Sequence, residues 1–116
     1  MAYKVRLTRP AEADAYAAYE YIRGAAPHSS DTWLSALFAA IDMLADMPTR
    51  CPVIPEADDL HHQARQLLFG KRNGFYRIIF DIQEASEEGP RVRVLRIWHG
   101  SRDVITASDF ETAIES

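Results

Sequence analysis

The chain has 116 residues, a length that suits one domain, and we expect residues 1–116 to fold as a single unit. Its hydrophobic fraction of 47% and charged fraction of 26% are typical of a folded globular protein and exclude general disorder. The single cysteine, Cys51, excludes an internal disulfide and a zinc site built on several thiolates. No apolar run approaches the roughly 20 residues that a membrane helix needs, so we expect a cytoplasmic protein with no membrane contact.

The net charge of −4 is distributed unevenly along the chain. Residues 1–62 carry 5 basic and 9 acidic side chains, and residues 104–116 add 3 acidic ones. Residues 63–103, in contrast, carry 8 basic and 5 acidic side chains. This basic middle predicts that one surface of the domain meets an anionic partner.

The first part of the chain predicts a strand and two helices. Residues 3–8 alternate apolar with charged or polar side chains, as a half-buried strand does. Pro10, followed by acidic residues, predicts the start of a helix that ends before Pro27. A second helix is expected to begin at residues 29–31, which are good N-cap types, and to end at Pro48. Its apolar side chains share one face: Leu34, Leu37, Phe38, Ile41 and Leu44.

The later part of the chain predicts three strands. Residues 49–62 have no periodicity and are interpreted as a loop, residues 65–69 as a short strand, and residues 75–82 as the clearest strand. A last strand covers residues 91–99, and both of its faces are apolar enough for a central position. Strict alternation places Val92, Val94, Arg96 and Trp98 on one face of it, opposite Arg93, Leu95, Ile97 and His99.

Residues 108–111 have the spacing of a capping box, so the C-terminal residues are expected to form a short helix or a tail. Runs of strands separated from runs of helices are typical of the α+β class. The predicted architecture is an N-terminal strand, a helical hairpin that covers one face of the sheet, a three-stranded antiparallel sheet, and the C-terminal tail or short helix.

Arg77 lies in the middle of a predicted strand among apolar neighbours. A half-buried arginine needs an anionic partner, and two alternatives are open. Arg77 forms an internal ion pair with Asp81 or Asp103, or its guanidinium contacts a phosphate or an acidic ligand. His99, at a strand end, is either a hydrogen-bonded structural residue or a general acid or base.

Neither a metal nor a cofactor is expected. His61 and His62 are adjacent in a loop rich in proline and acidic residues, and no second pair of ligands has a suitable spacing. We therefore interpret both as solvated loop residues. Cys51 is interpreted as a small apolar filler or a bystander, because the sequence offers no base beside it.

Four segments in order resemble the RelE/ParE superfamily of type II toxin–antitoxin toxins, the ParE branch more closely than the RelE branch. The resemblance spans residues 3–103. Its segments are Pro10-Ala11-Glu12-Ala13-Asp14 after the first strand, Leu44-x-x-Met47-Pro48, Tyr76-Arg77-Ile78-Ile79-Phe80 preceded by Arg65, and Val94-Leu95-Arg96-Ile97-Trp98-His99-Gly100-Ser101-Arg102-Asp103. One departure is Cys51, where the family often has glycine, which affects only loop geometry.

The resemblance implies a toxin that a co-encoded antitoxin neutralises. ParE-type toxins inhibit DNA gyrase and use no known catalytic set, so no catalytic residue is expected on that reading. RelE-type toxins cleave mRNA in the ribosome, and that reading would use Arg77 and Arg102, with His99 as a proton carrier. No tyrosine follows Tyr76, so the catalytic tyrosine of RelE-type toxins has no counterpart. The net charge of −4 also favours the ParE reading, because ribosome binding needs many basic contacts.

The expected partners are a cognate antitoxin and gyrase, with the ribosome or mRNA as the alternative and a non-toxic interaction module as a third reading. The chain is expected to form a homodimer or a toxin–antitoxin hetero-oligomer. Trp98 and Phe110 are expected to remain exposed as contacts. The acidic side chains of Asp109, Glu111 and Glu115 are expected to pair with Arg77 or Arg102. The predicted target or antitoxin contacts are Arg65, Lys71, Arg72, Arg77, Arg96, Trp98, His99, Arg102 and Phe110.

Overall fold

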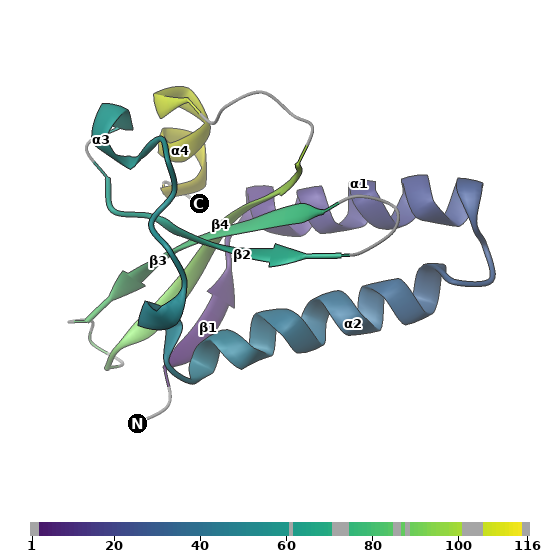
Figure 1. The fold of residues 1–116 in the computed structure, drawn as a ribbon, viewed down its shortest axis with the longest axis horizontal. Coiled ribbons are helices and arrows are strands. Elements are labelled where there is room, and N and C mark those ends of the chain that lie inside the picture. The colour runs from purple at the N-terminus through teal and green to yellow at the C-terminus, as the bar shows by residue number, and fades with distance from the viewer. Residues whose placement is uncertain are drawn as a thin grey trace.

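The computed structural model describes residues 3–60, 62–70, 75–84, 87, 89–100 and 106–114. The elements follow the predicted order (Figure 1). They are β1 (Lys4–Leu7), α1 (Arg9–Ala25), α2 (Ser30–Asp42), α3 (Ala57–Leu60), β2 (Arg65–Phe69), β3 (Tyr76–Gln83), β4 (Arg91–His99) and α4 (Ala107–Ile114), with 3₁₀ turns at Met43–Ala45 and Pro48–Arg50. The α+β class is confirmed, and the C-terminal residues do form a helix. The segment interpreted as a loop contains a 3₁₀ turn and the single helical turn α3.

The strands form one four-stranded sheet in the order β1-β4-β3-β2. Strands β2, β3 and β4 are antiparallel neighbours, as predicted, and β4 is a central strand. Strand β1 adds a fourth, parallel member, with Leu7 beside Val94. The sheet is therefore mixed, and the N-terminal strand is its edge opposite β2.

The helical hairpin covers one face of the sheet. At the start of α1, the Thr8 hydroxyl accepts a hydrogen bond from the backbone N–H of Ala11, which caps the helix. The buried alanines of α1 let the helix approach the sheet closely, and α2 contributes Leu37 and Ile41. These side chains pack on Ile78 and Phe80 of β3 and on Val92 and Val94 of β4. This layer is the main hydrophobic core.

The opposite face of the sheet is also covered, by α3, α4 and the segment between the hairpin and β2 (Figure 1). Ile54, Ile79 and Leu95 form a second core there, together with Trp98 and Phe110. The expectation that Trp98 and Phe110 remain exposed is wrong, because both are almost fully buried. Burial of the Phe110 ring is what holds α4 on the sheet.

A register shift in β4 explains why the strict alternation of faces fails. Ile79 pairs with Arg96 but the next residue, Phe80, pairs with Val94, so Leu95 has no partner in β3. Such an extra residue turns the following side chains to the other face. Ile97 consequently joins Val94 in the main core, and Trp98 joins Leu95 in the second core. The predicted faces are correct up to Leu95 and reversed after it.

Candidate functional site

The guanidinium of Arg77 is bound inside the chain. Its Nη1 and Nη2 donate to the two carboxylate oxygens of Glu56, at 2.9 and 2.8 Å, and its Nε donates to Gln66 Oε1 at 2.8 Å. Both side chains are largely buried, with 14% of Arg77 and 9% of Glu56 exposed. The predicted internal ion pair exists, but its partner is Glu56 rather than Asp81. Asp103, the other predicted partner, lies outside the described residues.

Arg93 takes the aspartate that was expected for Arg77. Asp81 lies directly opposite Arg93 in the β3–β4 pairing and accepts from its Nε at 3.1 Å and its Nη2 at 2.6 Å. The same carboxylate contacts His62 Nε2 at 3.0 Å, and the His62 ring packs against Phe110. His62 is therefore a partly buried member of this network and not the solvated residue that was expected, while His61 lies outside the described residues.

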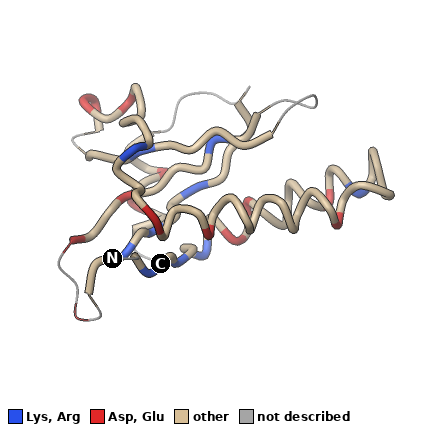
Figure 2. The backbone as a smooth tube through the Cα atoms, turned by 60° about the horizontal axis from the view of Figure 1, so that its bottom comes forward, with Lys and Arg blue, Asp and Glu red and all other residues tan. Residues whose placement is uncertain are grey.

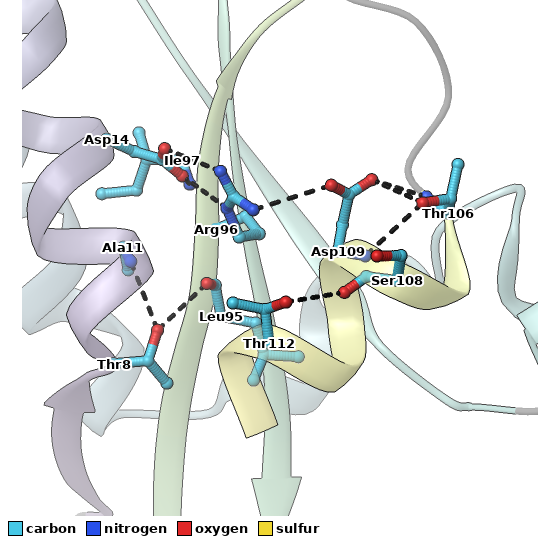
Figure 3. Close-up of polar contacts among 10 residues, drawn as sticks. All are labelled: Thr8, Ala11, Asp14, Leu95, Arg96, Ile97, Thr106, Ser108, Asp109 and Thr112. Atoms are coloured by element: carbon cyan, nitrogen blue, oxygen red, sulfur yellow. Dashed lines mark hydrogen bonds and ion pairs between the residues drawn. The ribbon is translucent and has the colours of Figure 1, made fainter. Parts of the chain in front are cut away.

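Arg96 joins three elements (Figure 3). Its Nε and Nη2 donate to the two oxygens of Asp14 in α1, at 2.8 and 2.9 Å, and its Nη1 lies 3.7 Å from Asp109 in α4. Its guanidinium also lies 5.3 Å from the centre of the Trp98 ring. Asp14 additionally accepts the backbone N–H of Ile97 at 3.0 Å. The hydrogen bonds to Asp14 raise the pKa of the Arg96 guanidinium above its ordinary value.

The contact between Asp14 and Arg96 connects two sequence segments on which the family resemblance rests. The aspartate closes the segment that begins at Pro10, and the arginine lies in the segment from residue 94 onward. Next to it, the Thr8 hydroxyl lies 3.0 Å from both the Val94 and Leu95 carbonyl oxygens and donates to them at the bulge. These motif residues therefore hold α1 against β4.

The remaining predicted site residues are partly accounted for. Arg65 donates from Nη1 to the carbonyl oxygens of Cys51 and Thr49, at 2.6 and 3.2 Å, and so fixes the turn before β2. The ring of His99 packs edge-on against that of Tyr76, 5.1 Å away. Burial raises the pKa of the Tyr76 phenol and that of the Cys51 thiol. Three predicted contacts lie outside the described residues: Lys71, Arg72 and Arg102.

Asp109, one of the acids expected to pair with Arg77 or Arg102, lies beside Arg96 instead. Glu115 lies outside the described residues. Figure 2 shows that basic and acidic positions are interleaved along the described chain. Within that part of the chain, no group of three His, Cys, Asp or Glu side chains could hold a metal ion. None of its helices has the length and apolarity to cross a bilayer.

Apolar side chains are exposed at one end of the sheet, where β2 ends and β3 begins. Leu68 is 56% exposed and Phe75 is 50% exposed. Leu68 pairs with Arg77 across the two strands, and the Phe75 carbonyl accepts the backbone N–H of Gly100 at 2.6 Å. A Cβ atom at Gly100 would meet that carbonyl oxygen at 3.0 Å, so the close approach favours glycine. We call Leu68 and Phe75 the loop-end patch.

Sequence reasoning missed the acidic partners Asp14 and Glu56, and it assigned Asp81 to Arg77 instead of Arg93. In the sequence, Asp14 has the position of an acidic residue at a helix start, and Glu56 lies in a segment interpreted as a loop. Asp81 is the one whose partner has a sequence signal, because it lies across from Arg93 on the neighbouring strand. It also missed Leu68 and Phe75, because single exposed apolar residues carry no pattern of their own. The structure thus places the candidate cations Arg77 and Arg96 in ion pairs, binds Arg65 to backbone carbonyl oxygens, and leaves apolar groups exposed beside Arg77.

Comparison with known families gives one match. Residues 5–104 match a family described as ParE toxin of type II toxin-antitoxin system, parDE. The match covers β1 through β4 and stops before α4. Comparison with curated protein sequences gives no match.

Proposed function

Because the chain belongs to the family of ParE toxins of type II toxin–antitoxin systems, which implies an antitoxin partner, we propose that it inhibits DNA gyrase by binding and that its cognate antitoxin neutralises it. This function requires a cytoplasmic protein. It needs no catalytic side chain, only a surface that stays folded and accessible on the free toxin.

The observation that carries this proposal is the state of Arg77. Metal-independent RNA cleavage needs cations that can reach the developing charge on phosphorus, together with a base and an acid. Both terminal nitrogens of Arg77 are directed at Glu56, and its Nε at Gln66. A carboxylate already occupies the fork that a phosphate would use. If the chain were a ribonuclease, it would therefore have to break the largely buried ion pair between Arg77 and Glu56 before each encounter with RNA.

The same holds for the other arginines of the central strand. Arg93 and Arg96 each direct two nitrogens at an aspartate. Neutralised in this way, they contribute little to a field that attracts an RNA or a ribosome, in keeping with the net charge of −4. Recognition of a protein partner is supported instead by the loop-end patch, where exposed apolar groups suit a contact from which water is excluded.

The direct test is a supercoiling assay with purified gyrase and purified full-length chain. We expect inhibition that rises with the amount of chain and is reversed by the product of the neighbouring antitoxin gene. Primer extension on translated mRNA after induction provides the second arm, and we expect intact transcripts. Cleaved transcripts with unaffected gyrase would support the mRNA interferase, and growth without arrest on expression would support the non-toxic module. Either outcome would overturn the proposal.

Variants of the loop-end patch test where the contact lies. Leu68→Ser with Phe75→Ser removes two half-exposed apolar groups, so we expect normal folding and at least a tenfold loss of gyrase inhibition. The matched control is Met43→Ser. Met43 is 58% exposed and directly follows the C-terminal end of α2, outside the loop-end patch. Equal effects of the patch variant and the control would contradict this assignment.

A further inference from the structure

Strands β1 and β4 carry adjacent basic side chains on one face of the sheet. The two strands pair in parallel, and residues that pair across two strands point to the same face. We call two cross-strand rows the basic rows: Lys4, Arg91 and Gln83 form the first, and Arg6, Arg93 and Asp81 form the second. Each row begins with a base on β1 and a base on β4, and it ends on β3. With four basic side chains and one acidic side chain, the basic rows have a net charge of +3.

The acidic side chain of the basic rows neutralises only one of the four bases. Asp81 accepts two hydrogen bonds from Arg93. Arg91 donates to the uncharged amide oxygen of Gln83. Arg6 is exposed, and it forms no ion pair with any residue that the structure describes. Like charges directly across two strands destabilise a sheet, so the basic rows favour an anion beside them.

Protection of the sheet edge explains only half of this pattern. Charged side chains on an edge strand discourage pairing with another strand, and Lys4 and Arg6 lie on the edge strand β1. Arg91 and Arg93 lie on the central strand β4, which already has a neighbouring strand on both sides. Edge protection therefore gives no reason for a second base beside each of the first two. Binding of an acidic group gives one, because two adjacent cations attract a carboxylate more strongly than one does.

The backbone of β1 has unpaired hydrogen-bonding groups beside these charges. The N–H groups of Lys4 and Thr8 donate to carbonyl oxygens of β4 or of the residue before it, so alternate residues along β1 face β4. Val5 and Leu7 lie between them and direct their N–H and C=O groups outward. Within the described part of the chain, these outward groups have no hydrogen-bond partner. An extended segment of another protein can pair with such an edge.

From these observations we propose that the outer edge of β1 binds an extended acidic segment of a protein partner, which adds a fifth strand to the sheet. Carboxylates at every second position of the segment lie beside Lys4 and Arg6. The residues between them lie beside the partly buried Val5 and Leu7, at the margin of the main core, and are therefore apolar. Strand β1 and the β2 strand of the loop-end patch are opposite edges of the sheet, so the proposal goes beyond gyrase inhibition and does not rest on it.

Two other occupants fit this edge less well. A second copy of β1 would pair with the backbone groups, but it would place Lys4 and Arg6 beside the same basic side chains of the other copy. A nucleic acid would neutralise the bases, but it has no regular row of N–H and C=O groups to pair with Val5 and Leu7. An acidic strand satisfies both the charges and the backbone.

Fluorescence anisotropy of the natural full-length chain with a labelled probe tests the proposal. The probe is a short synthetic peptide of alternating glutamate and valine. We expect a dissociation constant below about 1 mM, which Arg6→Glu raises at least about tenfold because an attraction becomes a repulsion. The new carboxylate would lie beside Arg93, so we expect this variant to fold. The matched control is Arg23→Glu in α1, which makes the same change of charge at an arginine that is 61% exposed, and it should alter binding by less than about twofold.

Two further probes separate strand addition from simple attraction of charges. The same peptide with every backbone nitrogen methylated keeps its carboxylates but has no N–H to donate, and we expect it to bind at least about tenfold more weakly. Equal binding of the two peptides, no binding up to about 1 mM, or equal effects of Arg6→Glu and Arg23→Glu would overturn the proposal. Short single-stranded DNA is the second probe. If it bound more tightly than the peptide and Arg6→Glu abolished its binding, the edge would belong to a nucleic acid and the proposal would be refuted.

Discussion

On strands β2 and β3, a charged side chain is largely buried and the apolar side chains next to it are exposed. Arg77 itself is a charged group that the chain keeps inside, held by Glu56. Its cross-strand neighbour Leu68, and Phe75 nearby, are apolar groups that the chain leaves exposed. Composition alone would assign recognition to the cation and packing to the apolar groups. Charged side chains on the sheet can thus hold its layers together, while the exposed apolar groups are the proposed contact.

The largest expected effect concerns Asp14. Asp14→Ala leaves the largely buried Arg96 without its main partner and also removes the acceptor of the Ile97 N–H. Removing one member of such a pair costs about 3–5 kcal/mol of the free energy of unfolding. Urea denaturation measures the loss. Asp109→Ala is the control. Its 3.7 Å contact with Arg96 is more exposed, and its other contacts are exposed hydrogen bonds from the Thr106 N–H and hydroxyl at the start of α4, so its loss should cost about 1 kcal/mol.

A slightly smaller effect is expected at Glu56. Glu56→Ala leaves Arg77 unpaired in the second core region, so we expect a loss of about 3 kcal/mol in the free energy of unfolding. An unchanged denaturation midpoint would mean that Arg77 is not held by this carboxylate and is available to a ligand.

A smaller effect is expected at Gly100, which lies next to the exposed Phe75. Gly100→Ala forces a Cβ atom against the Phe75 carbonyl oxygen at 3.0 Å, a backbone group that cannot rotate away. We expect a loss of about 1–2 kcal/mol in the free energy of unfolding, measured by thermal denaturation. Because the strain acts at the backbone of Phe75, gyrase inhibition should fall as well. A variant with full stability would show that the close approach is not required.

The smallest effect is a dependence on pH. Burial raises the pKa of the Tyr76 phenol above its ordinary 10.0, so the folded chain favours the neutral phenol. The unfolded chain loses this proton first, and stability must therefore fall as the pH rises above about 10. Tyr76→Phe keeps the ring and removes the titrating group. Its stability should fall less steeply over the same range, and equal slopes would contradict a buried phenol.

Much of the fold followed from local patterns, and the rest depended on contacts that no local pattern records. The alternation in residues 75–82 and the apolar stripe of the second helix gave the correct elements because each covers several residues with one period. The predicted faces of β4 are wrong after Leu95, since a bulge at that residue depends on the neighbouring strands and on Thr8. The burial of Phe110 failed because it depends on where α4 docks.

The expectation that Arg77 has an anionic partner is confirmed, because a half-buried guanidinium requires an opposite charge. Its partner could not be predicted. Glu56 lies in a segment without periodicity, and the turn that brings it over β3 is fixed by backbone contacts such as those of Arg65. The loop-end patch could not be predicted either, because the exposure of Phe75 depends on how the other elements pack around it and not on its neighbours in the sequence.

The proposed function assigns recognition of the target to the loop-end patch and not to the strand arginines. The most direct test compares gyrase inhibition by two variants. Glu56→Gln with Arg77→Gln removes both charges of the pair together, which preserves folding far better than removing one. Leu68→Ser with Phe75→Ser removes the patch. We predict that the first variant inhibits gyrase within about threefold of the natural chain and that the second loses at least about tenfold. A folded first variant that no longer inhibits gyrase, beside a fully active second variant, would contradict the account.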